Sequence, residues 1–170
     1  MAPGKFQRMT EPLPFDSAKF RQVLGHFSTG VTVVTAAAES GPVGLAVGSF
    51  TSVSLDPPLV AFFPDKGSST WPKIEASGHF CVNVLADTQE DVCRRFAARG
   101  EDKFAGLGWK LAGSGSPQLD GVLAWIDCDI DTVSEAGDHF SVVGRVRDLG
   151  VGTEGSPLLF FRGGFGRFAP

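Results

Sequence analysis

The segment Gly44-Leu-Ala-Val-Gly-Ser-Phe-Thr-Ser-Val-Ser-Leu-Asp-Pro-Pro-Leu-Val-Ala-Phe-Phe63 decides how the rest of the chain is interpreted. It begins as an apolar strand, becomes a run of small hydroxylated residues around Phe50, turns at Pro57-Pro58 and resumes as a second apolar strand. Small side chains leave backbone N–H groups accessible, and a flat ligand with a polar edge needs such groups. Taken alone, the segment is more simply a serine-rich strand edge and loop, so its meaning depends on the remaining sequence.

Composition limits the class of protein. The chain has 170 residues, of which 42% are hydrophobic and 20% charged, which predicts one domain with a sizeable core. A net charge of −4 without a basic block disfavours nucleic acid as a partner. No apolar run reaches the ~18–20 residues of a membrane span, and residues 1–11 do not resemble a signal peptide. Residues 1–14, with three prolines, are predicted to be an N-terminal arm before a single domain over residues 15–170.

The cysteines bear on the compartment. Cys81, Cys93 and Cys128 are odd in number, far apart and without metal-ligand spacing. Such a pattern is typical of reduced thiols, which predicts a cytoplasmic protein with no metal site.

The expected elements are mainly short strands separated by glycine and proline. Asp16 is a predicted N-cap, and the apolar residues that follow it with helical spacing are Phe20, Val23, Leu24 and Phe27. Further helices are predicted from Ser69 or Thr70 to Ser77, and from Asp87 or Thr88 to Gly100. Strands are predicted over 31–36, on both arms of the 44–63 segment, and over 80–85, 122–133, 140–149 and 158–162. Residues 100–121 are expected to be a loop, and the tail from Gly163 shows no periodicity.

Most of these strands are joined by hairpins. The predicted fold is therefore mainly β with helices, with an antiparallel Greek-key sheet of six or seven strands closed into a barrel.

A candidate anion site lies in Lys66-Gly-Ser-Ser-Thr70, at the predicted start of a helix. Free N–H groups, hydroxyls and an ammonium meet there, and phosphate is a common occupant of such sites. Simple helix capping beside a solvated lysine explains the same residues and is the more frequent case.

A second candidate is His139, in the turn Gly137-Asp-His139, where it could meet a ligand at the mouth of the barrel. Turn histidines are more often merely exposed. We do not expect Asp138 and His139 to form a catalytic pair, because adjacent residues on a strand face opposite ways. His26 and His79 stand beside apolar residues and are interpreted as structural. The chain has no Gly-x-Gly-x-x-Gly after a strand and no intact Gly-x-Ser-x-Gly, which disfavours a Rossmann site and a serine hydrolase.

Seven segments in order resemble the short-chain flavin reductase family, the reductase components of two-component flavin-dependent monooxygenases. They span about residues 20–165: Phe20-Arg21 with 25–35, 48–60, Ser68 with Thr70, 77–85, 121–125, 136–139 and 157–164.

This resemblance implies the FMN-binding split barrel, a homodimer, FMN or FAD near the dimer interface, and NADH or NADPH as electron donor. It also implies that reduced flavin passes to a separate monooxygenase component. Flavin-binding residues implied by the match are Thr29, Gly30, Val31 and Thr32 near the pocket, Gly48, Ser49, Phe50, Thr51 and Ser52 along the isoalloxazine, and Lys66, Ser68, Ser69 and Thr70 around the phosphate. His139 matches the histidine on the nicotinamide side. The alternatives are an oxidase or electron-transfer module with permanently bound FMN, and a flavin-binding protein without turnover.

Overall fold

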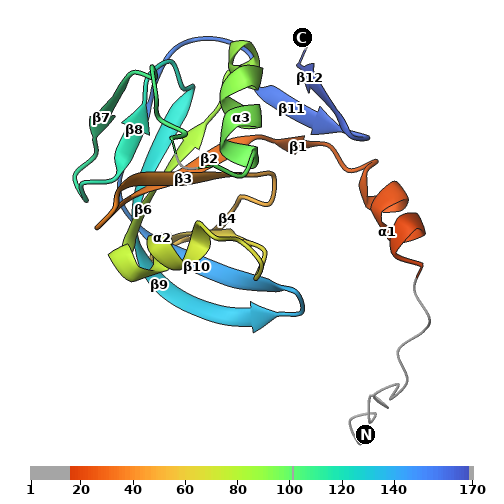
Figure 1. Cartoon of the computed structure of the whole chain (residues 1–170), viewed down its shortest axis with the longest axis horizontal. Coiled ribbons are helices and arrows are strands. Elements are labelled where there is room, and N and C mark those ends of the chain that lie inside the picture. Colours follow the sequence, from red (N-terminus) through yellow and green to blue (C-terminus); the bar gives the residue numbers. More distant parts are fainter. Residues whose placement is uncertain (1–15, 101, 169–170) are drawn as a thin grey trace, which may run out of the picture.

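The computed structural model describes residues 16–100 and 102–168, so the predicted arm over residues 1–14 lies outside the described residues (Figure 1). The α-helices of the described residues are α1 (Ser17–Leu24), α2 (Trp71–Ser77) and α3 (Glu90–Ala97), and a 3-10 helix, η1 (Asp87–Gln89), precedes α3. The first strands are β1 (Thr29–Gly30), β2 (Thr32–Ala38), β3 (Gly41–Val47), β4 (Thr51–Leu55), β5 (Pro58–Phe62) and β6 (His79–Val84). The later ones are β7 (Trp109–Leu111), β8 (Pro117–Leu119), β9 (Ala124–Ala136), β10 (His139–Val151), β11 (Leu158–Phe161) and β12 (Gly164–Arg167).

The main sheet has seven strands in the order β3-β2-β6-β9-β10-β5-β4, and its neighbours pair antiparallel. This confirms the predicted antiparallel, mainly β class. The expectation of a closed barrel is wrong, because β3 and β4 are the two edges and do not pair with each other. Yet they follow one another in sequence, separated only by Gly48–Phe50. A connection of three residues spans at most about 14 Å, and the sheet must therefore curl until its edges approach each other. The segment over residues 44–63 thus crosses the split between the two edge strands.

Two short hairpins were not expected from the sequence. One, β7–β8, lies inside the predicted loop over residues 100–121, and the other, β11–β12, includes the tail. Strands of three or four residues carry too little alternation to be recognised. Tertiary contacts fix the first hairpin instead: the Leu119 N–H donates to buried Asn83 Oδ1 at 2.8 Å, and the buried Thr35 hydroxyl donates to the Pro117 carbonyl.

The core lies on both faces of β2. Val31 and Val33 pack in a cluster with Phe96 of α3, whereas Val34 and Ala36 pack in a cluster with Trp71 of α2. Alternate residues of a strand face opposite sides of a sheet, so an unbroken apolar run predicts a strand that is covered on both faces. That is the place of β2 beneath α3 on one face and α2 on the other (Figure 1).

A glycine lets the largest aromatic cluster form. A Cβ on Gly144 of β10 would lie 2.3 Å from Cζ of Phe80, so no larger residue fits without moving that ring. The Phe80 ring packs edge-on against Phe62, with ring centroids 5.1 Å apart, and Phe62 packs against Trp71 at 5.8 Å. This packing carries α2, and with it the segment that precedes α2, against the inner face of the sheet.

Helix α1 begins as predicted but packs little. The Asp16 carboxylate accepts the Ala18 N–H at 2.9 Å, as an N-cap does. Its apolar face is exposed: Val23 is 57% and Leu24 54% accessible, and Phe27, just beyond the helix, is 76% accessible. Figure 1 shows α1 standing apart from the main sheet. No helix among residues 16–100 and 102–168 is both long and apolar enough to cross a membrane.

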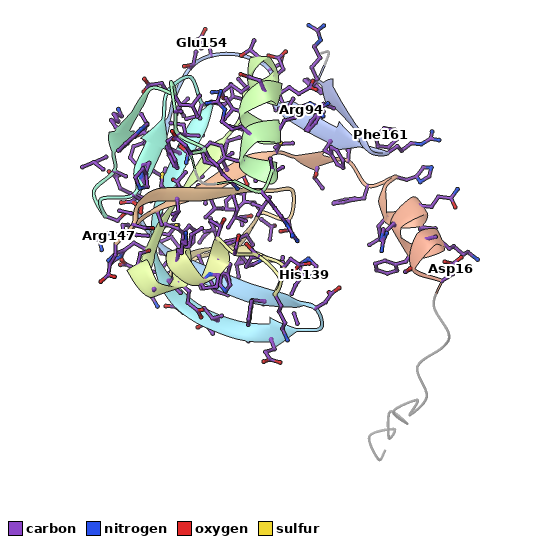
Figure 2. All side chains as sticks on the ribbon, viewed as in Figure 1. Asp16, Arg94, His139, Arg147, Glu154 and Phe161 are labelled. Atoms are coloured by element: carbon purple, nitrogen blue, oxygen red, sulfur yellow. The ribbon has the colours of Figure 1, made fainter. Side chains whose placement is uncertain are left out.

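An ion cluster on the outer face of the sheet predicts a dependence of stability on pH. Asp129 of β9 lies 2.7 Å from Arg147 of β10, which is labelled in Figure 2, and 2.8 Å from Nδ1 of His79 on β6. The hydrogen bond from Arg147, followed by that from His79, holds the pKa of Asp129 below its usual value. A carboxyl whose pKa is lowered by folding stabilises the protein above its ordinary pKa of ~4 and stops doing so as the pH falls through the folded value.

We therefore expect Asp129→Asn to lower the free energy of unfolding at pH 7 by up to about 1 kcal/mol, since the groups are half exposed. Urea unfolding should show this difference shrinking below about pH 4. The control is Asp148→Asn, a carboxylate on β10 that has no ion pair within the described residues. An equal loss at pH 7 and pH 3 would mean that the pairing of Asp129 does not matter.

Candidate functional site

A cavity of about 750 Å³ opens at the split of the barrel. Its walls come from the end of β3 with Gly48 and Ser49, the loop from Phe63 to Thr70, the end of α3 with the loop after it, and His139. Figure 2 places His139 at the tip of the β9–β10 hairpin. The cavity has the size of a pocket for a cofactor-sized molecule.

The loop before α2 is built by its own side chains. The Asp65 carboxylate accepts the Gly67 N–H at 2.6 Å, and Ser68 Oγ accepts the N–H groups of Thr70 at 3.3 Å and Trp71 at 3.2 Å. The expectation that Ser69 or Thr70 would cap the helix is therefore wrong, because Thr70 is the N-cap residue by position but Ser68 supplies the capping oxygen. The N–H groups of this segment were expected to be free, but those of Lys66, Gly67, Ser68 and Thr70 are already hydrogen-bonded within the chain. The hydroxyls of Ser69 and Thr70 have no hydrogen-bond partner within the described residues, and both residues line the cavity.

Lys66 lies outside the lining of this cavity. Its ammonium is 3.0 Å from Glu135 and 5.5 Å from the centre of the Phe140 ring. The Lys66 N–H donates to the Asp138 carbonyl at 3.0 Å. Lys66 thus joins the loop to the β9–β10 hairpin. Asp65 and Ser68 also line the cavity, but their side-chain oxygens accept backbone N–H groups of the loop, whereas the hydroxyls of Ser69 and Thr70 are uncommitted in the described part of the chain.

His139 is held by the residue before it. Its Nδ1 lies 2.7 Å from the Asp138 carboxylate, and the hydrogen bond from His139 lowers the pKa of Asp138. These neighbours can form a hydrogen bond because Asp138 belongs to the two-residue turn and only His139 begins β10, so they do not face opposite sides of one strand. With Nδ1 engaged, Nε2 of His139 has no partner within the described residues. A backbone bridge between Asp65 and His139 joins the start of β10 to the loop that carries Ser69 and Thr70.

The remaining predicted residues divide between the cavity and its surroundings. Gly48 and Ser49 line the cavity, and Ser49 Oγ accepts the Phe63 N–H at 3.0 Å. Phe50 packs against the core, while Thr51 and Ser52 lie exposed on edge strand β4. The segment from Thr29 to Thr32 lies behind the wall: Thr29 Oγ1 would be 3.0 Å from a Cβ on Gly48, Val31 is buried in the core, and the Thr32 hydroxyl donates to Val47 O.

Two cations of the cavity were not predicted as site residues. Arg99 and Lys103 follow α3 and line the cavity. Arg99 lies at the end of the helix predicted from Asp87 or Thr88 to Gly100, and Lys103 lies in the predicted loop over residues 100–121. Lys103 Nζ donates to the Phe96 carbonyl at 2.8 Å, and burial lowers the pKa of Lys103. No spacing in the sequence could have found this residue, since the contact that places it is tertiary.

These residues fit a flavin. Ala46, Gly48 and Ser49 give a wall of small side chains along the cavity, where a flat ring can approach the backbone. Unpartnered hydroxyls of Ser69 and Thr70, with the cations Arg99 and Lys103, form a donor set suited to a phosphate.

Comparison with known proteins identifies the family of the chain. The family model described as "Flavin reductase like domain" matches residues 24–169. The chain is 60% identical to a flavin reductase from Pseudomonas putida over 155 residues, which is 91% of each protein. It is 50% identical to HsaB, the reductase subunit of a flavin-dependent monooxygenase from Rhodococcus jostii, covering 91% of this chain and 80% of that protein.

Solved structures show the same fold. Nitrilotriacetate monooxygenase component B from Mycobacterium thermoresistibile superposes with a TM-score of 0.88 at 50% identity, covering 90% of this chain and 87% of that one. The NADH:FAD oxidoreductase SgcE6 from Streptomyces globisporus, in complex with NAD and FAD fragments, gives 0.86 at 40% identity, covering 91% and 94%. The family predicted from the seven sequence segments is thereby confirmed, and the chain belongs to the flavin reductase like domain family.

Proposed function

We propose that the chain is an NAD(P)H-dependent flavin reductase that reduces FMN or FAD and supplies the reduced flavin to a separate monooxygenase. The observation that carries the proposal is the cavity at the barrel split, where free hydroxyls of Ser69 and Thr70 stand at one wall and His139 at another. Relatives named as reductase subunits of flavin-dependent monooxygenases support the same activity.

The protein's task is to bind and orient. Ser69 and Thr70, with Lys103 and Arg99 nearby, hold the phosphate of the flavin. Gly48 and Ser49 border its ring, and Ser49 is itself fixed by the backbone of Phe63. His139, oriented through Nδ1 by Asp138, offers Nε2 to the nicotinamide side. The bound flavin supplies the redox chemistry, so no nucleophile or strongly shifted acid is required of the chain. Holding two reactants in contact and excluding bulk water is the remaining contribution to rate.

The test is a steady-state assay of NADH and NADPH oxidation with and without FMN, FAD and riboflavin. The proposed function requires oxidation that depends on added flavin, with flavin that washes off the purified protein. Flavin that stays bound through purification and turns over without addition would favour the oxidase or electron-transfer alternative. Bound flavin without oxidation of either nucleotide would favour the binding protein.

We also propose that the protein acts as a homodimer in the cytoplasm. Val23, Leu24 and Phe27 expose apolar surface on and beside α1, and Phe160 and Phe161 expose more on the nearby β11 (Figure 2). Phe161 is packed edge-on against His26 with ring centroids 6.2 Å apart, which joins the two areas. Contiguous exposed apolar surface of this kind marks interaction sites. Cys81, Cys93 and Cys128 are free and buried, as suits a reducing compartment.

For the dimer, we expect sedimentation at micromolar concentration to give twice the mass of the chain. Replacing both Leu24 and Phe27 by Asp should shift the protein to the monomer, because each charge would have to be buried at the interface. Lys19→Asp, also on α1, is the matched control for a change of charge. A wild-type monomer with flavin bound would contradict the proposal.

A further inference from the structure

A second cavity of about 390 Å³ adjoins the first. It lies between the β2–β3 turn, the start of α2 and the loop after α3. The residues that line both cavities are Ser69, Thr70, Gly100 and Lys103. The two spaces are therefore continuous at the hydroxyls assigned above to the flavin phosphate.

The second cavity carries positive charge. Lys73 and Lys103 line it, and no acidic residue does so within the described residues. Lys103 Nζ is 2.8 Å from the Phe96 carbonyl oxygen and 3.5 Å from that of Gly44, so its hydrogen-bond partners within the described residues are neutral oxygens. Burial lowers the pKa of Lys103, which means that its charged form lacks compensation in the chain itself. The Lys73 ammonium has no ion pair or hydrogen bond within the described residues.

The cavity also offers apolar surface from Pro42, Val43 and Phe104. Ser40 also lines this cavity. A ligand with an anionic group beside a flat, weakly polar group would pair with the lysines and pack against the apolar residues of this cavity.

We propose that this second cavity binds the adenosine-phosphate half of FAD and makes the protein prefer FAD to FMN. The inference rests on the proposed function and names the flavin that it uses. The second phosphate of FAD is joined to the first through one bridging oxygen, so it must lie next to the group bound by Ser69 and Thr70. The second cavity begins at these two residues, with Lys103 and Lys73 to meet the added charge. FMN ends at the first phosphate and leaves this space unused.

Lys73 gives the sharpest test, because it lines only the second cavity, whereas Lys103 lines both and also anchors the loop after α3. Dissociation constants of FAD and FMN are measured by fluorescence titration for the full chain, Lys73→Met and Lys73→Glu. We expect the wild type to bind FAD more tightly than FMN. Lys73→Met should weaken FAD about 10-fold and FMN by less than about two-fold, and Lys73→Glu should weaken FAD further. Lys110→Met, on β7 and outside both cavities, should leave both flavins unchanged.

Several results would overturn the inference. Equal affinity of the wild type for FAD and FMN, or equal weakening of both by Lys73→Met, would show that the cavity takes no adenosine phosphate of FAD. A variant that raises KM for NADPH but not for NADH, with FAD unaffected, would assign the cavity to the 2′-phosphate of NADPH instead. In each of these cases flavin-dependent oxidation of NAD(P)H persists and the proposed function stands. Absence of that oxidation in the wild type would remove the proposed function itself.

Discussion

The double variant Ser69→Ala with Thr70→Val should bind FMN far more weakly than the wild type does and bind riboflavin almost as well. Both hydroxyls line the cavity and have no partner within the described residues, so they are available to a ligand. Loss of two hydrogen bonds to a charged phosphate costs about 2–5 kcal/mol, which is roughly 30- to 5,000-fold in affinity. Fluorescence titration with FMN and riboflavin gives both constants, since riboflavin lacks the phosphate.

Ser68→Ala is the matched control. Ser68 Oγ accepts two N–H groups at the start of α2, so its loss should act on the helix rather than on the phosphate. A lost cap lowers the free energy of unfolding by about 1 kcal/mol. We expect a lower urea midpoint, with similar small losses of affinity for FMN and riboflavin. If the Ser69 and Thr70 variant also weakened both flavins equally, the hydroxyls would be structural and the phosphate would lie elsewhere.

The difference between Ser68 and its neighbours shows what the sequence of this loop could and could not predict. Three successive hydroxylated residues after Lys66-Gly67 indicate an anion site or a helix cap. Ser68 supplies the cap, and Ser69 and Thr70 belong to the proposed anion site. Backbone dihedral angles decide which hydroxyl caps the helix. Thr70 already has helical φ and ψ angles, and its side chain makes no hydrogen bond to the N–H groups at the start of the helix. Lys66 was grouped with the phosphate by proximity in sequence, yet Glu135, 69 positions later, accepts its ammonium.

The fold was predictable where apolar residues repeat over long strands. The pairing of β9 with β10 extends over Ala124 to Val151, and the turn between them has Gly137 at a φ of +65°. That the barrel stays open was not predictable, because strand patterns indicate which strands pair but not whether the two edge strands, β3 and β4, pair with each other. The β7–β8 hairpin depends on Asn83, whose buried amide forms hydrogen bonds to β2 at Val33 and to β8 at Pro117 and Leu119.

For α1, the sequence predicts a buried apolar face but does not identify what buries it. The spacing of Val23, Leu24 and Phe27 predicts a helix with one buried side, and within a single chain that side is exposed. A hydrophobic pattern indicates that a surface is buried but does not indicate whether the same chain or another molecule buries it. In the proposed dimer, the second subunit would bury this face.

Substitution of His139 is expected to have a large effect on the rate of flavin reduction. Its Nδ1 is bound to Asp138, its ring stands at the cavity wall, and Nε2 is left for a ligand. A side chain so fixed can position the nicotinamide without taking part in proton transfer. His139→Ala should therefore lower the rate of flavin reduction at saturating NAD(P)H by roughly 10- to 100-fold, or about 1.4–2.7 kcal/mol. Flavin affinity should change much less.

Anaerobic stopped-flow reduction separates this rate from binding, because the rate is followed as a function of the NAD(P)H concentration. His139→Gln should recover part of the rate, since the terminal amide of glutamine can occupy the place of Nε2, whereas His139→Asn, whose amide mimics Nδ1, should not. A purely structural histidine, held through Nδ1, would give the opposite order, because His139→Asn would keep the contact with Asp138 and His139→Gln would not. The role assigned to His139 fails if His139→Ala, once saturated with NAD(P)H, reduces flavin at the wild-type rate. In that case the pair with Asp138 serves only to hold the hairpin turn against the loop at Asp65.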